Sequence, residues 1–238
     1  MRLKLVIEYD GTAFHGWARQ PELRTVEGEL RRALRHVYGS YADLVVAGRT
    51  DTGVHALGNV VSVEAEGGPP PGRAPAALNA VLPDDLAVLA AERAPERFHA
   101  RYDARSRSYR YRVLRRRVRS PHETRRALWH PRPLDLKALN QNAAVLRGAH
   151  DFRAFTPTET RHEVFVRTVE QARWVELDEN VVAFEITADS FLRHMVRTLV
   201  GTMLDGRDLK PLLAGVPRKE AGATAPPYGL YLTGVSYG

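Results

Sequence analysis

The stretch from Val166 to Thr187 reads VRTVEQARWVELDENVVAFEIT. Two runs rich in β-branched and aromatic residues, 166–177 and 181–187, flank a short polar segment. This pattern predicts two antiparallel strands joined by a turn. An apolar segment at 191–204 follows and is expected to be a helix. Because this order breaks the strict βαβ alternation of a doubly wound sheet, we expect the α+β class with mainly antiparallel sheets.

The remaining chain mixes short strands and helices in the same irregular order. Thr25 is the expected N-cap of one helix, and Glu27 suits the positive end of its dipole. A surface linker rich in Gly and Pro is expected at 66–75. The remaining expected strands are 3–9, 44–47, 60–63, 86–91, 109–113 and 231–236, the remaining helices are 26–37, 76–81 and 135–147, and the two expected halves are 1–97 and 98–238.

The charge of the chain favours a polyanionic partner. Its 238 residues include 35 Lys and Arg against 28 Asp and Glu, which gives a net charge of +7. Phosphates attract such a surface, so nucleic acid is the leading partner class. The chain has no Cys, which excludes disulfides and thiolate chemistry. The N-terminus has no signal-peptide pattern and no apolar run reaches about 20 residues, so we expect a cytoplasmic protein with no membrane partner.

The segment GRTDTGVHA at 48–56 is too polar and Gly-rich to continue a strand or a helix. It predicts a tight turn in which hydroxyl and backbone N–H groups can hold the Asp51 carboxylate. Local chemistry leaves two interpretations of Asp51 open. It is either a structural cap of the turn or a nucleophile.

The segment RYDARSRSYRYRVLRRRVR at 101–119 combines Tyr with Arg. In a strand, Tyr109 and Tyr111 point to one face while Arg110 and Arg112 point to the other. Aromatic rings beside Arg suit the binding of an unstacked base next to phosphates. The alternative is that the Tyr residues belong to the core and the Arg residues to a solvated face.

The segment FLRHMVRTLVG at 191–201 predicts a helix with an apolar stripe formed by Phe191, Met195 and Leu199. Arg193 and Arg197 form a second stripe, also four residues apart. An Arg beside an apolar stripe either extends its head to water or pairs with a carboxylate in a cleft. The sequence leaves both interpretations open.

Two classes of cofactor have no motif in this chain. The nine His residues lack the spacing of an HExxH metal site. The chain also lacks a Walker A or GxGxxG motif. We therefore expect neither a metal nor a nucleotide cofactor.

Taken together, the motifs resemble those of the tRNA pseudouridine synthase I (A) family, in the family's order. The resemblance covers nearly the whole chain. The motifs that carry it, besides GRTDTGVHA and FLRHMVRTLVG, are YDGTAFHGWARQP (9–21), RTVEGEL (24–30), RSRSYRYRV (105–113), GAHDFRAF (148–155) and AGATAPPYGLYL (221–232).

This resemblance implies two ferredoxin-like α/β halves joined around a basic cleft, and a homodimer that binds tRNA. It implies isomerisation of uridine to pseudouridine in the anticodon stem-loop, without a cofactor. By matching motifs, Asp51 is the nucleophile, Tyr109 lies against the target base and Arg197 pairs with Asp51. The expected substrate-binding residues are Arg49, Arg110, Arg112, Arg193 and Leu199.

The chemistry is compatible with a chain that carries no cofactor motif, because no electrons or phosphoryl groups are exchanged. A carboxylate can attack C1′, add to C6 of the base, or promote loss of the base to a glycal. The sequence does not separate these routes. Two other classes stay open, an RNA glycosidase that releases free uracil and a noncatalytic RNA-binding protein.

Overall fold

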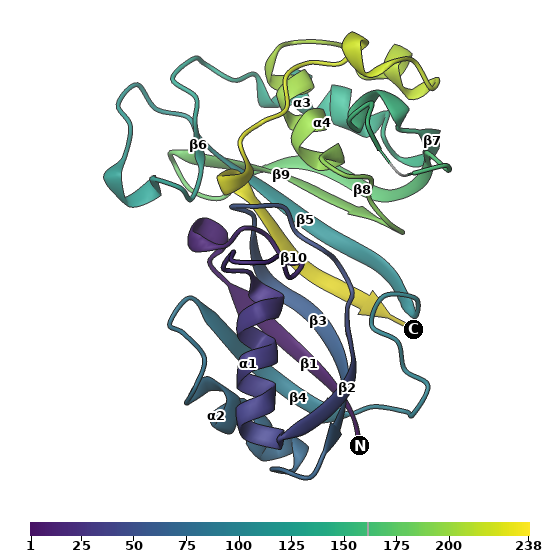
Figure 1. Ribbon diagram of the computed structural model, residues 1–238. Coiled ribbons are helices and arrows are strands. Elements are labelled where there is room, and N and C mark those ends of the chain that lie inside the picture. Colours follow the sequence, from purple (N-terminus) through teal and green to yellow (C-terminus); the bar gives the residue numbers. More distant parts are fainter. Residues whose placement is uncertain (161) are drawn as a thin grey trace. The chain divides into compact units, whose positions relative to one another are not determined.

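The computed structural model describes residues 1–160 and 162–238, and their contacts divide the chain into two compact units. Unit 1 consists of Met1–Arg105 and Tyr231–Gly238, and unit 2 of Ser106–Leu230 (Figure 1). The C-terminal strand therefore belongs to unit 1, which also contains the N-terminus. The expected domain halves, 1–97 and 98–238, stay a prediction about domain organisation.

Unit 1 is built on an antiparallel sheet. Alternating residues of its first strand, Leu3, Leu5 and Ile7, are fully buried, which is the period-2 pattern of a strand with one core face. The central strand β3 pairs antiparallel with β1 and β2 and parallel with β10, and β4 pairs with the other edge of β1. The strands are β1 (Arg2–Tyr9), β2 (Ser40–Val46), β3 (His55–Glu66), β4 (Leu86–Arg93) and β10 (Leu230–Tyr237).

Two helices, α1 (Val26–Tyr38) and α2 (Ala74–Asn79), accompany this sheet (Figure 1). The α1 side chains Leu30 and Leu34 are fully buried, and each contributes about 2 kcal/mol through burial. Thr25 caps α1, because its hydroxyl accepts a hydrogen bond from the Gly28 N–H at 3.2 Å. The predicted helix and its cap are therefore confirmed.

Unit 2 also has an antiparallel sheet, in the order β5-β9-β8-β7, with β6 parallel to β5. The predicted pair at 166–177 and 181–187 is present as β8 and β9, so this prediction is confirmed. Because both units combine helices with mainly antiparallel strands, the predicted α+β class is confirmed. The strands are β5 (Ala104–Leu114), β6 (Leu128–Trp129), β7 (Gly148–Asp151), β8 (Val166–Glu176) and β9 (Val181–Ala188).

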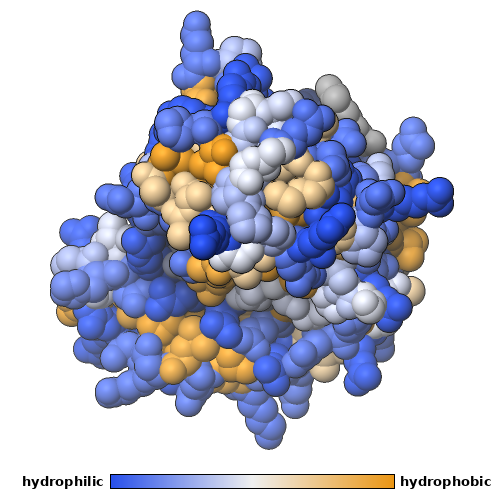
Figure 2. Space-filling model, turned by 90° about the horizontal axis from the view of Figure 1, so that it is seen from below, coloured by the Kyte–Doolittle hydropathy of each residue, from blue (hydrophilic) through white to orange (hydrophobic). Residues whose placement is uncertain are grey.

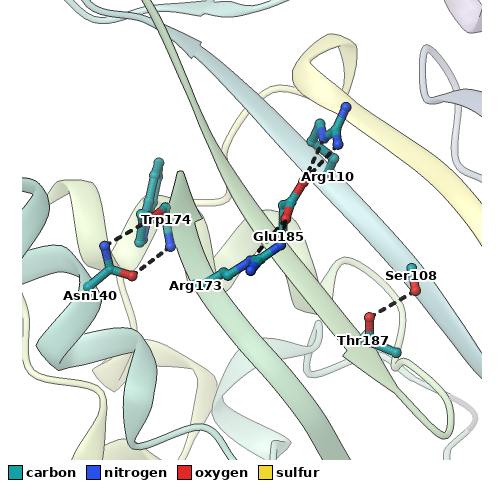
Figure 3. Close-up of polar contacts among 7 residues, drawn as sticks. All are labelled: Ser108, Arg110, Asn140, Arg173, Trp174, Glu185 and Thr187. Atoms are coloured by element: carbon teal, nitrogen blue, oxygen red, sulfur yellow. Dashed lines mark hydrogen bonds and ion pairs between the residues drawn. The ribbon is translucent and has the colours of Figure 1, made fainter. Parts of the chain in front are cut away.

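The helices α3 (Leu136–Ala144) and α4 (Met195–Leu204) lie on the same side of this sheet (Figure 1). The Asn140 side chain ties α3 to β8, since it donates to the Trp174 carbonyl at 3.0 Å and accepts from the Trp174 N–H at 2.8 Å (Figure 3). This pairing satisfies two backbone groups of β8 that otherwise need a strand neighbour.

The predicted boundaries of both unit 2 helices are wrong at one end. The helix expected over 191–204 begins at Met195, because His194 adopts the left-handed conformation with φ 62°. The helix expected over 135–147 ends at Ala144, and Asp135 is its N-cap. The strands β6 and β7 were not predicted, since two and four residues are too few to show a period.

Within the described residues, none of the helices is both long enough and apolar enough to cross a bilayer. The face drawn in Figure 2 is mostly hydrophilic, and its apolar residues form small separate patches.

Candidate active site

The Asp51 loop, residues 48–54, has neither helical nor strand structure and leads into β3. Its main chain is held by the segment that follows β1. The Trp17 N–H donates to the Thr50 carbonyl at 3.0 Å, and the Gly53 N–H donates to the Phe14 carbonyl at 3.3 Å. The Val54 N–H closes the loop on the Asp51 carbonyl at 3.1 Å. The loop is therefore fixed through its backbone.

The side chains of Tyr9, Thr50 and Asn59 form a buried polar cluster that holds the loop. The Tyr9 and Thr50 hydroxyls lie 2.8 Å apart, and Asn59 donates to the Gly48 carbonyl at 2.8 Å and to the Tyr9 hydroxyl at 3.3 Å. Burial raises the pKa of Tyr9 to about 12, so its hydroxyl stays protonated at neutral pH. Each buried polar group of the cluster thus has a partner, as a rigid site requires.

Two glycines allow the close approach of the segments. A Cβ on Gly11 would overlap the Val54 carbonyl oxygen. Gly16 has φ +84°, and its Cβ would lie 2.9 Å from the Thr50 carbonyl oxygen. The motif at 9–21 contains both glycines, but the sequence does not predict that they make room for Val54 and Thr50, because these partners lie about 35 or more residues away.

Asp51 lies in this braced loop between buried and exposed positions. It is half-buried, Thr50 before it is buried, and Arg49 is exposed. On the neighbouring segment, the Asp10 carboxylate accepts from the Thr12 N–H at 3.0 Å and from the Thr12 hydroxyl at 2.6 Å, and it lies 3.0 Å from His55 Nδ1. The loop therefore presents Asp51 on a rigid support, which suits a reacting group.

In unit 2, Tyr109 and Tyr111 have different environments on β5. Tyr109 is half-buried, and the Phe191 ring packs edge-to-face against it at 4.9 Å between centroids. Tyr111 is fully buried, its hydroxyl donates to the Pro226 carbonyl at 2.8 Å, and burial raises its pKa. Tyr111 is therefore a core residue, whereas Tyr109 is only partly buried.

Arg197 lies on α4, and the segment 222–226 sets its direction. Its Nε donates to the Ala225 carbonyl at 2.8 Å, and the Ala225 N–H donates back to the Arg197 carbonyl at 3.1 Å. Gly201 lets this segment approach, because a Cβ there would overlap the Ala223 carbonyl oxygen. This pair of hydrogen bonds fixes the direction in which the Arg197 guanidinium leaves α4.

The other predicted residues near α4 differ in accessibility. Arg193 is exposed and precedes the helix. Leu199 is fully buried, so any contact with a substrate requires its surroundings to move. Both substrate-binding assignments stay predictions.

Arg110 and Arg112 lie on the strand face opposite Tyr109, and both are paired. Glu185 accepts from Arg110 at 2.7 Å and from Arg173 at 2.9 Å, which links β5, β9 and β8 in one row (Figure 3). Arg112 pairs with Glu123 at 3.0 Å. Burial raises the pKa of Glu185, but hydrogen bonds from the two arginines outweigh it, so the net pKa is lowered.

The predicted residues are distributed over both units. Arg49 and Asp51 belong to unit 1, whereas Tyr109, Arg110, Arg112, Arg193, Arg197 and Leu199 belong to unit 2. The pairing of Asp51 with Arg197 stays a prediction. Within the described part of the chain, no group of three or more His, Asp or Glu side chains is arranged to hold a metal ion.

Comparison with known proteins identifies the family. The family model described as tRNA pseudouridine synthase matches residues 5–103 and 143–238. The chain belongs to this family. The resemblance found in the motifs is therefore confirmed, and so is the prediction of an isomerase. Both matched ranges include predicted site residues, Asp51 in the first and Arg197 in the second.

Relatives match over almost their full length. The tRNA pseudouridine synthase A of Acetivibrio thermocellus is 37% identical over 242 residues, which cover 99% of each chain. That of Thermus thermophilus is 44% identical over 248 residues, which cover 99% of this chain and 96% of the relative. A chain in the crystal structure of a Cbf5-Nop10-Gar1 complex is 12% identical, with a TM-score of 0.38, and the match covers 96% of this chain and 57% of that one.

Proposed function

We propose that this chain isomerises uridine to pseudouridine in the anticodon stem-loop of tRNA, with Asp51 as the nucleophile. The observation that carries the proposal is the braced Asp51 loop, which lies inside the matched part of the family model. A nucleophile must be held in place while the substrate moves, and the buried Tyr9 and Asn59 side chains hold this loop through hydrogen bonds to Thr50 and Gly48.

The reaction breaks the bond from uracil N1 to C1′ and forms a bond from C5 to C1′. C5 loses a proton and N1 gains one, so the product is an isomer of the substrate. A base within a stem must first leave its stack, which costs a few kcal/mol. Stacking against the ring of the partly buried Tyr109 would offset part of this cost, and Arg49 would help to displace the base.

Arg197 is proposed to pair with the Asp51 carboxylate. A guanidinium next to a carboxylate favours its ionised form and sets its direction through charge-assisted hydrogen bonds. The contact of its Nε with Ala225 supports this role, because it restricts the head of the side chain.

The proposal extends to the setting in which the enzyme works. We expect a cytoplasmic homodimer with tRNA as its partner, as the family resemblance implies. The excess of seven positive charges supports binding to a polyanion.

The experiment is incubation of the purified chain with an unmodified tRNA transcript, followed by mapping of pseudouridine and measurement of free uracil. We expect pseudouridine within the anticodon stem-loop and no uracil release. Release of free uracil would show an RNA glycosidase instead. A transcript that is bound but unchanged would show a noncatalytic RNA-binding protein.

A further inference from the structure

A cavity of about 460 Å³ lies along α1 in unit 1, and its lining is strongly basic. The α1 positions that line it recur at helical spacing, so they share one face of the helix. This face is distinct from the buried stripe that contains Leu30 and Leu34. Arg19 completes the wall from the loop that precedes the helix. The lining residues are Arg19, Gly28, Arg31, Arg32, Arg35 and His36.

The charge of this α1 cavity is only partly compensated. Arg31 pairs with Glu27 at 2.7 Å, and Arg32 pairs with Glu29. Over residues 1–160 and 162–238, no carboxylate forms an ion pair with Arg19 or Arg35. Arg32, Arg35 and His36 are exposed, so an incoming anion can reach them.

Helix stability alone does not account for this arrangement. Cations in the last turn of a helix interact favourably with its dipole by about 0.3 to 1 kcal/mol, which explains Arg35 and His36. It does not explain Arg19, which lies outside the helix and still lines the cavity. The cavity is thus lined by arginines from two segments, and the planar fork of each guanidinium suits the oxygens of a phosphate.

Gly28 leaves room on the wall of the cavity. A Cβ at this position would meet only the Thr25 hydroxyl, at 3.0 Å. The helix surface is therefore open at this point, between Arg19 and the arginines of the following turns. A phosphate and its sugar can approach the helix more closely here than at a position with a long side chain.

The α1 cavity is also connected to the braced Asp51 loop. The Arg19 N–H donates to the Glu27 carboxylate at 2.9 Å, which fixes the Arg19 backbone to the start of α1. Two residues earlier, Trp17 holds the Thr50 carbonyl. Two residues span at most about 7 Å, so one short segment supports both the cavity and the loop. A single RNA molecule bound at the loop can therefore extend to the cavity.

We propose that the α1 cavity binds backbone phosphates of the substrate tRNA, outside the nucleotide that is modified. This inference rests on the proposed function. The contact is independent of sequence, because guanidinium groups bind phosphate oxygens and no base edge is involved. Its role is to hold the RNA in register with the Asp51 loop.

The test is a double variant, Arg19→Gln with Arg35→Gln, compared with the matched control Arg73→Gln with Arg93→Gln. All four side chains are exposed residues of unit 1, and both variants remove two charges. Binding of an unmodified tRNA transcript is measured over a range of salt concentrations. We expect the cavity variant to bind about tenfold more weakly at 0.15 M salt, and its salt slope to fall by about two. The control should change neither value by a comparable amount.

Four further measurements check the folding of the cavity variant, the role of charge, the source of the phosphate and the kinetic step that is affected. Thermal unfolding of the cavity variant should match that of the control, and an Arg19→Lys with Arg35→Lys variant should recover most of the slope, because the charge returns. Titration with pyrophosphate tests a site for a free anion. In steady-state modification of tRNA, the defect should fall on KM rather than kcat.

Binding of tRNA by the cavity variant equal to that of the control overturns the proposal. If pyrophosphate nevertheless binds tightly to the wild type, the cavity is a site for a free anion. If neither ligand depends on these arginines, the basic face serves an acidic protein partner or solvation. The binding assay needs no turnover, so failure of the proposed chemistry does not hide the result.

Discussion

The Asp51 loop of unit 1 and the Glu185 row of unit 2 are both polar, but they are held in different ways. The loop depends on backbone contacts and on a buried cluster of Tyr9, Thr50 and Asn59. The Glu185 row depends on strand register, because Arg110 and Arg173 lie opposite Glu185 on neighbouring strands. A contact made inside the protein is costly to lose, whereas a partly exposed ion pair contributes little. The two regions should therefore respond differently to substitution.

The largest expected effect is that of Gly11→Ala. The added methyl group would overlap the Val54 carbonyl, so the backbone must shift next to the Asp51 loop. We expect a loss of about 3 kcal/mol of unfolding free energy and strongly reduced activity. Gly72→Ala is the matched control, because nothing lies within 4 Å of the new methyl group. Equal unfolding temperatures for the two variants would contradict the close approach of these segments.

A smaller effect is expected for Tyr9→Phe. This change keeps the ring but removes the hydroxyl that contacts Thr50 and Asn59, and it leaves the buried Thr50 hydroxyl without the partner that Tyr9 supplies. We expect a loss of about 1 to 2 kcal/mol in urea unfolding and a decrease in kcat. Tyr102→Phe is the control, since its side chain is 75% exposed. A Tyr9 variant as stable and active as this control would show that the buried cluster does not support the loop.

The smallest expected effect is that of Glu185→Gln, about 1 kcal/mol at pH 7. The lowered pKa of Glu185 means that its ionised form is favoured by folding. The stability that ionised Glu185 contributes is fully present above its pKa in the unfolded chain, about 4.5. This stability is lost as the pH falls further, through the lowered pKa of Glu185 in the folded protein. Unfolding followed from pH 7 to pH 3 should therefore show a smaller acid-induced loss in the variant.

The matched control for this pH series is Glu176→Gln. Glu176 pairs with Arg115, but its side chain is 59% exposed, so less than about 0.5 kcal/mol is expected. If both variants lose the same stability, the three-strand row around Glu185 contributes no more than an exposed ion pair.

The difference between the two regions also explains what the sequence could predict. The β5 alternation follows from a period of two, so the opposite faces of Tyr111 and Arg110 were predictable. Likewise, the Thr25 cap and α1 follow from local preferences. The class of the fold and the family were predicted from strand patterns and from motifs in order.

The braces of the candidate site were not predictable in this way. Asn59 lies 11 residues from Gly48 and 50 from Tyr9, so no local pattern reports their hydrogen bonds. The helix predicted from Phe191 begins only at Met195, because His194 adopts a backbone conformation that helical periodicity does not reveal. The basic face of α1 did have a signal, the recurrence of Arg31, Arg32 and Arg35 at helical spacing, but its function depends on Arg19 from another segment.

The most direct test of the central claim is the single-turnover rate of pseudouridine formation by Asp51→Asn at saturating tRNA. Asp84→Asn is the matched control, because it removes one exposed carboxylate from the same unit. We predict that the Asp51 variant loses roughly 10³-fold or more in rate and binds tRNA within about tenfold of the wild type, since phosphate contacts dominate affinity. The Asp84 variant should keep the wild-type rate. A rate for Asp51→Asn close to that of Asp84→Asn would contradict the assignment of Asp51 as the nucleophile.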